Sequence, residues 1–68
     1  MIVAILTGDG NDPEGAWVRL DAIVDESHCS GTLMGEPFDD FGRHRGDSCL
    51  VEPRNDDELG GMLAYIVA

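Results

Sequence analysis

The feature that most constrains the fold is a regular alternation of side chains between Ala16 and Asp25. Every second residue from Ala16 to Val24 is aliphatic, while the residues between them include Trp17 and Arg19. Side chains of a β-strand point alternately to the two faces of a sheet, whereas those of a helix repeat about every 3.6 residues. The segment is therefore predicted to be a half-buried strand whose aliphatic side faces the core.

Three neighbouring segments in the first half of the chain have the composition of a strand, a loop and a hairpin partner. Residues 1–7 are uncharged and rich in β-branched side chains, which favours a strand covered on both faces. Turn-forming residues fill the stretch 8–15 and predict a loop. The run 29–34 follows closely enough after 16–25 to pair with it as a hairpin, and Pro37 ends it.

The middle of the chain is predicted to be a loop followed by a short strand. Residues 38–46 are polar apart from Phe38 and Phe41, which suggests a packed loop anchored by the two aromatic rings. The run 48–52 should form a strand that is closed by Pro53, because proline cannot donate to a strand ladder.

The last part of the chain leaves two alternatives open at residues 55–61. The acidic residues there suit a helix N-terminus, but Gly60 and Gly61 would each destabilise a helix by about 1 kcal/mol. This stretch is therefore expected to be a turn or a single helical turn. Residues 62–67 are predicted to be the last strand and to pair with 1–7 in the middle of the sheet.

Together these segments predict an all-β or mostly β fold. The 68 residues leave room for one domain, 1–68. We expect a small antiparallel curled sheet or an SH3-like barrel of about five strands, allowing a short helical turn near residues 55–60. Because so small a core only just offsets the conformational entropy lost on folding, a homodimer, a crosslink or a partner would add useful stability.

The chain is strongly acidic, with 14 Asp and Glu against four Arg and no Lys, for a formal net charge of −10. A protein that binds nucleic acid needs a basic patch to neutralise phosphates, and anionic membranes repel an acidic surface. Neither direct nucleic-acid binding nor membrane binding is expected. Two explanations of the acidity remain: carboxylates that keep the protein soluble, or an acidic face that docks on a basic protein surface.

The sequence predicts a cytoplasmic protein with two cysteines in one of two states. No stretch has the roughly 20 apolar residues that span a bilayer, and the first residues lack the pattern of a signal peptide. Cys29 and Cys49 fit the cytoplasm as reduced, partly buried thiols. If they lie on neighbouring strands, they could instead form a disulfide.

Catalysis and metal binding are not expected. The side chains of His28, Cys29, His44 and Cys49 are zinc-ligand types, but their spacing is not that of a zinc knuckle. A nucleophilic cysteine beside a histidine needs positive surroundings, which the net charge opposes. The acidic stretch 9–14 lacks the ligand spacing of an EF-hand. The sequence therefore predicts no catalytic residue, no metal site and no cofactor.

Part of the chain resembles a small family of uncharacterised bacterial domains. The resemblance covers residues 16–53 and rests on Trp17-Val18-x-Leu20, Gly31-x-Leu33, Glu36-Pro37 and Gly46-Asp47. The family pattern runs Trp-Val, Gly-x-Leu, Asn-x-Pro and Gly-Asp, and Gly35 stands here in place of the Asn. The resemblance implies a curled, barrel-like antiparallel sheet and a non-enzymatic role, and it provides no catalytic residues.

The predicted partner-binding surface lies around the alternating strand. Trp and Arg are the residues that most often anchor protein interfaces, so an outward row containing both is the best candidate, unless residues 38–41 cover it. Carboxylates two residues apart on a strand are about 6.6 Å apart, close to the spacing of phosphates along a nucleic-acid strand. The predicted partner-binding residues are Trp17, Arg19, Asp21, Ile23, Asp25, Glu26, Asp9, Asp12 and Glu14.

These features favour a non-enzymatic, acidic protein-interaction module that docks on a basic surface of a partner protein. One alternative is a phage or mobile-element inhibitor that mimics nucleic acid. Another is a small structural or assembly subunit whose apolar terminal strands complete a β-sheet with a second copy or with another protein.

Overall fold

The computed structural model describes residues 1–8, 10–56 and 61–68, and the described residues confirm the all-β prediction. The strands are β1 (Ile2–Gly8), β2 (Asn11–Asp25), β3 (His28–Leu33), β4 (Ser48–Asp56) and β5 (Gly61–Ile66). The predicted helical turn near 55–60 falls partly on Asn55 and Asp56, which lie in β4, and partly on residues 57–60, which lie outside the described residues.

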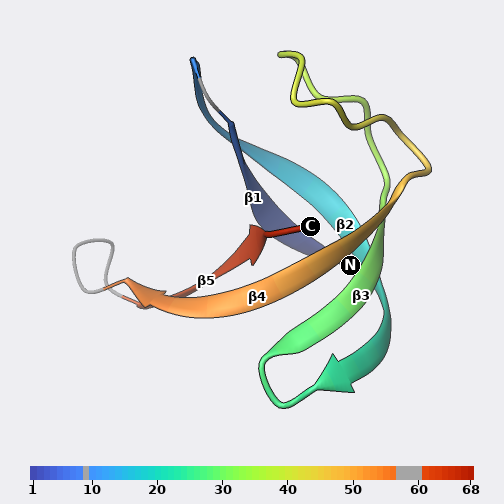
Figure 1. Ribbon diagram of the computed structural model, residues 1–68, viewed down its shortest axis with the longest axis vertical. Coiled ribbons are helices and arrows are strands. Elements are labelled where there is room, and N and C mark those ends of the chain that lie inside the picture. Colours follow the sequence, from blue (N-terminus) through green and yellow to red (C-terminus); the bar gives the residue numbers. More distant parts are fainter. Residues whose placement is uncertain (9, 57–60) are drawn as a thin grey trace.

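The five strands curl into one closed barrel in the order β1-β2-β3-β4-β5 (Figure 1). Each strand is antiparallel to the next along the chain, and the barrel closes through a parallel pair between Ile5 of β1 and Tyr65 of β5. The pair is parallel because the number of strands is odd. When five strands alternate in direction, the first and the last run the same way. The predicted pairing of the first and last strands is confirmed.

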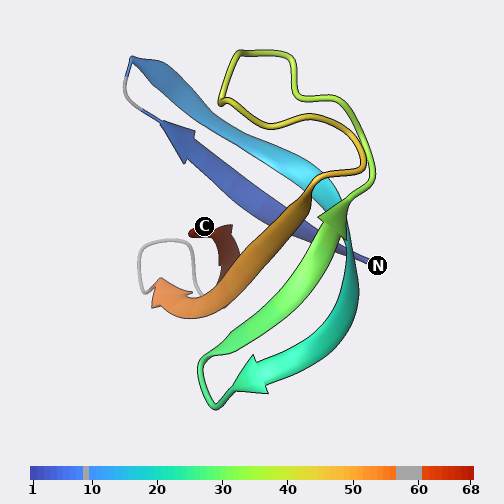
Figure 2. The same cartoon turned by 45° about the vertical axis from the view of Figure 1, so that its right-hand side comes forward.

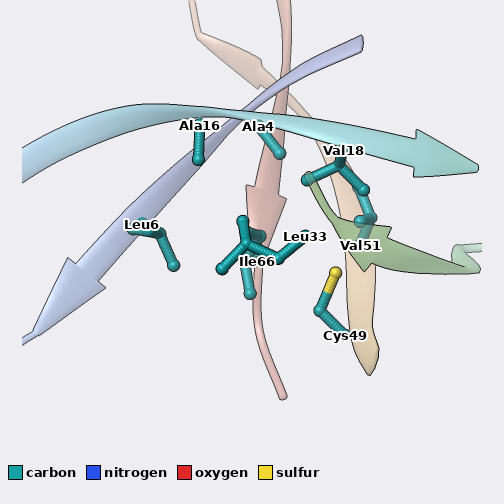
Figure 3. Close-up of a cluster of buried hydrophobic side chains, with 8 residues drawn as sticks. All are labelled: Ala4, Leu6, Ala16, Val18, Leu33, Cys49, Val51 and Ile66. Carbon is teal, nitrogen blue, oxygen red and sulfur yellow. The ribbon is translucent and has the colours of Figure 1, made fainter. Parts of the chain in front are cut away.

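The core is small and draws on every strand. Figure 3 shows side chains from all five strands converging on one interior. The largest fully buried side chains are those of Leu6, Val18 and Leu33. The buried hydrophobic residues are Ala4, Leu6, Ala16, Val18, Leu33, Cys49, Val51 and Ile66. The prediction that Ala16 and Val18 face the core is correct.

Gly31 allows β2 and β3 to approach each other closely. A Cβ atom at this position would lie 2.6 Å from Cγ1 of Val18 and 2.9 Å from the backbone oxygen of Arg19. Both distances are shorter than real Cβ contacts, so only a residue without a side chain fits between the two strands here.

The predictions for the first two strands need correction. β1 is not covered on both faces, since the side chain of Val3 is 51% exposed; a single-layer barrel leaves its outer face to solvent. The predicted loop 8–15 is largely strand, because Leu6 pairs with Glu14 and Gly8 with Asn11. A register shift between Leu6 and Gly8 makes room for Pro13 within the ladder.

β4 likewise continues where the sequence predicted that it would stop. Pro53 pairs with Ala64 of β5, whereas the pairing of β4 with β3 ends at Val51. Proline is tolerated where one edge of a strand no longer takes part in a ladder. The predicted strand end at Pro53 is therefore wrong.

The far half of β2 departs from the predicted alternation. Register shifts against β3 leave Asp21 and Val24 as extra residues in β2. The last pair between β2 and β1 joins Val18 to Ile2. Beyond Val18, β2 no longer pairs with β1 and extends away from the barrel wall. As a result, the predicted core residues Leu20, Ala22 and Val24 are exposed.

The β2–β3 hairpin and the loop of residues 34–47 lie at opposite ends of the molecule (Figure 2). The loop is at the top of the view and the hairpin turn is at the bottom. The predicted binding residues are spread along β2, whose ends lie near opposite ends of the molecule. They therefore form separate groups and not one surface.

Candidate protein-binding surface

Trp17 lies on the outer face of the barrel, as predicted. It pairs with Val3 of β1, and the flanking pairs, Ile2 with Val18 and Ala4 with Ala16, direct their side chains inward. The side chain of Trp17 is 57% exposed. The loop of residues 34–47 borders this face without burying it.

A hollow of about 280 Å³ lies between Trp17 and the loop. Gly15 and Ala16 of β2 also line it, and the Ala16 side chain itself points into the core. Phe38 borders the hollow from the loop and is 97% exposed, so the prediction that it anchors a packed loop is wrong. Phe41 does pack against the core. The hollow is lined by Glu14, Gly15, Ala16, Trp17, Gly35, Glu36, Pro37 and Phe38.

Two carboxylates in the wall of the hollow are held in place by the loop. Oε2 of Glu14 accepts a hydrogen bond of 3.0 Å from the backbone N–H of Phe38, and Oε1 lies 3.4 Å from the donor N of Asp39. Oε1 of Glu36 accepts a bond of 3.1 Å from the backbone N–H of Arg45. The loop thus fixes negative charge beside the aromatic rings.

The Glu36 side chain also pairs with His44, whose Nδ1 lies 2.8 Å from Oε2 of the carboxylate. The hydrogen bond and the charge of Glu36 raise the pKa of His44 above its ordinary value. The same hydrogen bond, with that from Arg45, lowers the pKa of Glu36. The pair therefore favours a protonated imidazole beside an ionised carboxylate.

Arg19 and Asp21 form a polar group on the outer face next to Trp17. Nε of Arg19 donates to Oδ1 of Asp21 at 2.9 Å, and the hydroxyl of Thr32 donates to Oδ2 at 2.7 Å. The bond from Thr32 and then that from Arg19 lower the pKa of Asp21. The structure therefore brings together Trp17, Arg19 and Asp21, as the sequence predicted.

Ile23 does not belong to the same face. It pairs with Cys29, which lies on the same face of β3 as Gly31 and Leu33, the face that points toward the core. The extra residue Asp21 reverses the alternation of β2, so Ile23 points to the opposite face from Trp17. Its side chain is 83% exposed because this part of the hairpin lies beyond the core.

The acidic residues at the hairpin turn have a local structural role. Oδ1 of Asp25 accepts a hydrogen bond of 2.7 Å from the backbone N–H of Ser27 and lies 2.9 Å from Nδ1 of His28. The bond from Ser27 and then that from His28 lower the pKa of Asp25. Asp25 and the exposed Glu26 thus lie at the end of the molecule opposite the hollow.

Two of the remaining predicted residues lie in the first part of β2. Asp12 is exposed, Glu14 reaches the hollow, and Asp9 lies outside the described residues. Sequence reasoning missed Phe38, Glu36 and Val3 as members of the surface. Glu36-Pro37 entered only as one step of the family pattern, and no local pattern in the sequence predicts that Glu36 and Phe38 line a hollow with Trp17.

The two cysteines are free thiols on neighbouring strands. Cys49 pairs with Gly31, two residues from Cys29 on β3. Burial raises the pKa of the Cys49 thiol, which disfavours the reactive thiolate. Within residues 1–8, 10–56 and 61–68, no three His, Cys, Asp or Glu side chains gather as ligands for a metal ion.

The described part of the chain contains no helix with the length and apolar character needed to cross a membrane. Comparison with protein-family models, with curated proteins and with solved structures found no match. The resemblance over residues 16–53 to the small bacterial domain family stays a prediction.

Proposed function

We propose that this chain is a non-enzymatic module that binds a partner protein through its acidic outer face, with the hollow beside Trp17 as the centre of contact. The observation that carries the proposal is the placement of exposed Trp17 and Phe38 on one hollow that also holds the carboxylates of Glu14 and Glu36. Exposed aromatic side chains at the centre of a polar rim are typical of interface anchors. The net charge of −10 favours a partner whose facing surface is basic.

An enzymatic role has less support. The raised pKa of Cys49 works against a nucleophilic thiolate. The pair of His44 and Glu36 lies on the surface, with both side chains more than half exposed, where water competes for the hydrogen bonds that catalysis would use.

The positions of the acidic residues also give little support to the hypothesis that the protein mimics a nucleic-acid backbone. Glu14, Asp21 and Asp25 each accept hydrogen bonds within the chain, and they lie on different parts of β2. A regular row of free carboxylates at the spacing of phosphates is what such mimicry needs.

The proposal can be tested with paired affinity baits. The wild-type protein and the variant Trp17→Ala would be immobilised and incubated with the same lysate of the native host at low and at high salt. We expect a partner that is retained by the wild type, is lost with the variant and dissociates as salt rises. Capture that is equal on both baits would contradict the proposal. Met62→Ala provides a matched control, because it removes an exposed apolar side chain of β5 that does not line the hollow.

A second candidate is a subunit that completes a β-sheet, and the free edge of β2 favours it. The terminal strands themselves pair within the barrel, but β2 continues past its last pair with β1, at Val18, to Asp25. Leu20, Ile23 and Val24 are exposed along this part of the strand. An edge of this kind can accept a strand from another chain. Sedimentation over a range of micromolar concentrations tests self-pairing, and a strict monomer would count against it.

A further inference from the structure

We infer that the hollow between Trp17 and Phe38 takes the side chain of an arginine from the partner protein. This inference rests on the proposed function and specifies the chemistry of the contact. The volume of about 280 Å³ lies just below the usual range for pockets that hold drug-sized ligands, and so suits one side chain.

The walls of the hollow combine the two kinds of group that recognise a guanidinium. The faces of the Trp17 and Phe38 rings attract a cation through their π-electrons, and a planar guanidinium can stack on either ring. Glu14 adds a negative charge to the same wall, and Glu36 adds a second carboxylate whose charge is partly balanced by His44. A neutral side chain of the same shape could still stack on a ring and donate hydrogen bonds, but it would lose the attraction that depends on positive charge.

The carboxylates are already oriented for this role. Glu14 is held by the backbone N–H groups of Phe38 and Asp39, and Glu36 by the backbone N–H of Arg45 and by His44. Each is positioned by the loop that also carries Phe38. Because these groups are ordered before binding, less conformational entropy is lost when the cation enters.

A second hollow continues the negative surface on the far side of Phe38. It shares Glu36, Pro37 and Phe38 with the first, and Asp39 and Asp40 add two further carboxylates to its walls. Arg43 and His44 also line it, so its charge is partly balanced. The surroundings of Phe38 are therefore acidic on both sides, which would guide a basic segment toward the aromatic rings.

The intrinsic fluorescence of Trp17 provides a direct measurement, because it is the only tryptophan in the chain. The intact protein would be titrated with the peptide acetyl-Gly-Arg-Gly-amide, and separately with the same peptide containing citrulline, a neutral isostere of arginine. Ionic strength would be held constant with NaCl. We expect a saturable change in fluorescence with the arginine peptide at millimolar concentration and a much weaker response to the citrulline peptide.

Substitutions of Phe38 separate the effect of the aromatic ring from that of its size. Because this side chain is 97% exposed, Phe38→Leu and Phe38→Tyr should both leave the fold intact. Leu removes the π-electrons and should weaken binding of the arginine peptide about two- to five-fold, whereas Tyr should retain it. Met62→Ala, which changes an exposed residue of β5 outside the lining of the hollow, should leave the titration unchanged.

The outcomes distinguish this inference from the proposed function. Equal responses to the two peptides, no saturable response to arginine, or equal affinity of the Leu and Tyr variants would each overturn the arginine site. If Trp17-dependent capture of a protein persists in that case, the proposed function stands without it. If the arginine peptide binds as expected but no protein is retained through Trp17, the hollow is a site for small cations and the proposed function fails.

Discussion

At the scale of single residues, carboxylates organise the surface of this protein as much as they charge it. Asp25 fixes the hairpin turn, Asp21 joins Arg19 to Thr32, and Glu36 holds the loop through His44. A short chain with a small core has few apolar contacts to order its loops, so local hydrogen bonds to side-chain acceptors have a larger share in doing so.

The pair of His44 and Glu36 predicts a measurable pH dependence. Because the pKa of His44 is raised on folding, its contribution to stability is present below the ordinary histidine pKa and is lost as pH rises through the folded value. The lowered pKa of Glu36 has the opposite sign, so its contribution is present above its ordinary pKa and is lost as pH falls through the folded value.

NMR titration of the His44 ring should therefore give a pKa above that of an ordinary histidine. In the variant Glu36→Gln the titration should move to lower pH, because the charge and the charged hydrogen-bond acceptor are both removed. Asp12→Asn is a suitable control, since this exposed carboxylate is not among the groups that shift His44. A His44 titration that is the same in wild type and Glu36→Gln would show that the pair does not form in solution.

Among the glycines that the structure describes, Gly31 is the one at which an added methyl group would lie closest to other atoms. Gly31→Ala would place Cβ 2.6 Å from Cγ1 of Val18 and should lower the free energy of unfolding by about 1–3 kcal/mol. Urea denaturation measures the change. Gly35→Ala is the matched control, because a Cβ there meets no atom within 4 Å, and its effect should be about 0.5 kcal/mol or less. Similar effects of the two substitutions would contradict the close approach of β2 and β3.

At the scale of elements, the loop of residues 34–47 is a structured part of the surface. Beyond the bonds to Glu14, the side-chain amide of Asn11 donates to the backbone oxygen of Asp40 at 2.9 Å. Backbone bonds between Leu33 and both Gly46 and Asp47 close its base. The loop is thereby tied to β2 at two points, which holds Phe38 beside the Trp17 face.

Removal of the Glu14 carboxylate should release one side of this loop. In Glu14→Ala, the backbone N–H groups of Phe38 and Asp39 lose their acceptor, so their hydrogen exchange should become about five times faster. Asp12→Ala, which removes an exposed carboxylate from the same strand, should leave these rates unchanged. If exchange at Phe38 is as fast in the wild type as in Glu14→Ala, the carboxylate does not hold the loop.

At the scale of the whole molecule, a small hydrophobic core has to offset the repulsion among many acidic side chains. Among the residues that the structure describes, eight buried side chains form the core, and the formal net charge of the chain is −10. Repulsion among the acids favours the expanded unfolded chain, although the folded state recovers part of that energy through local hydrogen bonds. A basic partner would reduce the repulsion further, which couples binding to stability.

Salt should therefore stabilise the free protein. Between about 10 mM and about 500 mM NaCl, screening of the acidic surface should raise the midpoint of thermal unfolding by about 5 °C. Circular dichroism or calorimetry measures the shift, and KCl should act in the same way because screening does not depend on the identity of the monovalent cation. A midpoint that is flat or falls with salt would show that internal ion pairs outweigh the repulsion.

The sequence by itself determined the fold class, the outward direction of Trp17 and the position of most strands. Alternation within 16–25 and the apolar run 62–67 are local signals, and local signals suffice for a strand whose neighbours follow it closely along the chain. The acidity is also evident from the composition, and the basic partner that it suggests stays a prediction.

Only the tertiary structure decided which residues share a face. The register of β2 against β3 makes Asp21 an extra residue and turns Ile23 away from Trp17, and no residue-by-residue pattern contains that register. Phe38 lines the same hollow as Trp17 because it is carried by a loop that hydrogen-bonds to Glu14. Contacts between residues far apart in the chain are set by closure of the barrel, and closure is a property of all five strands together.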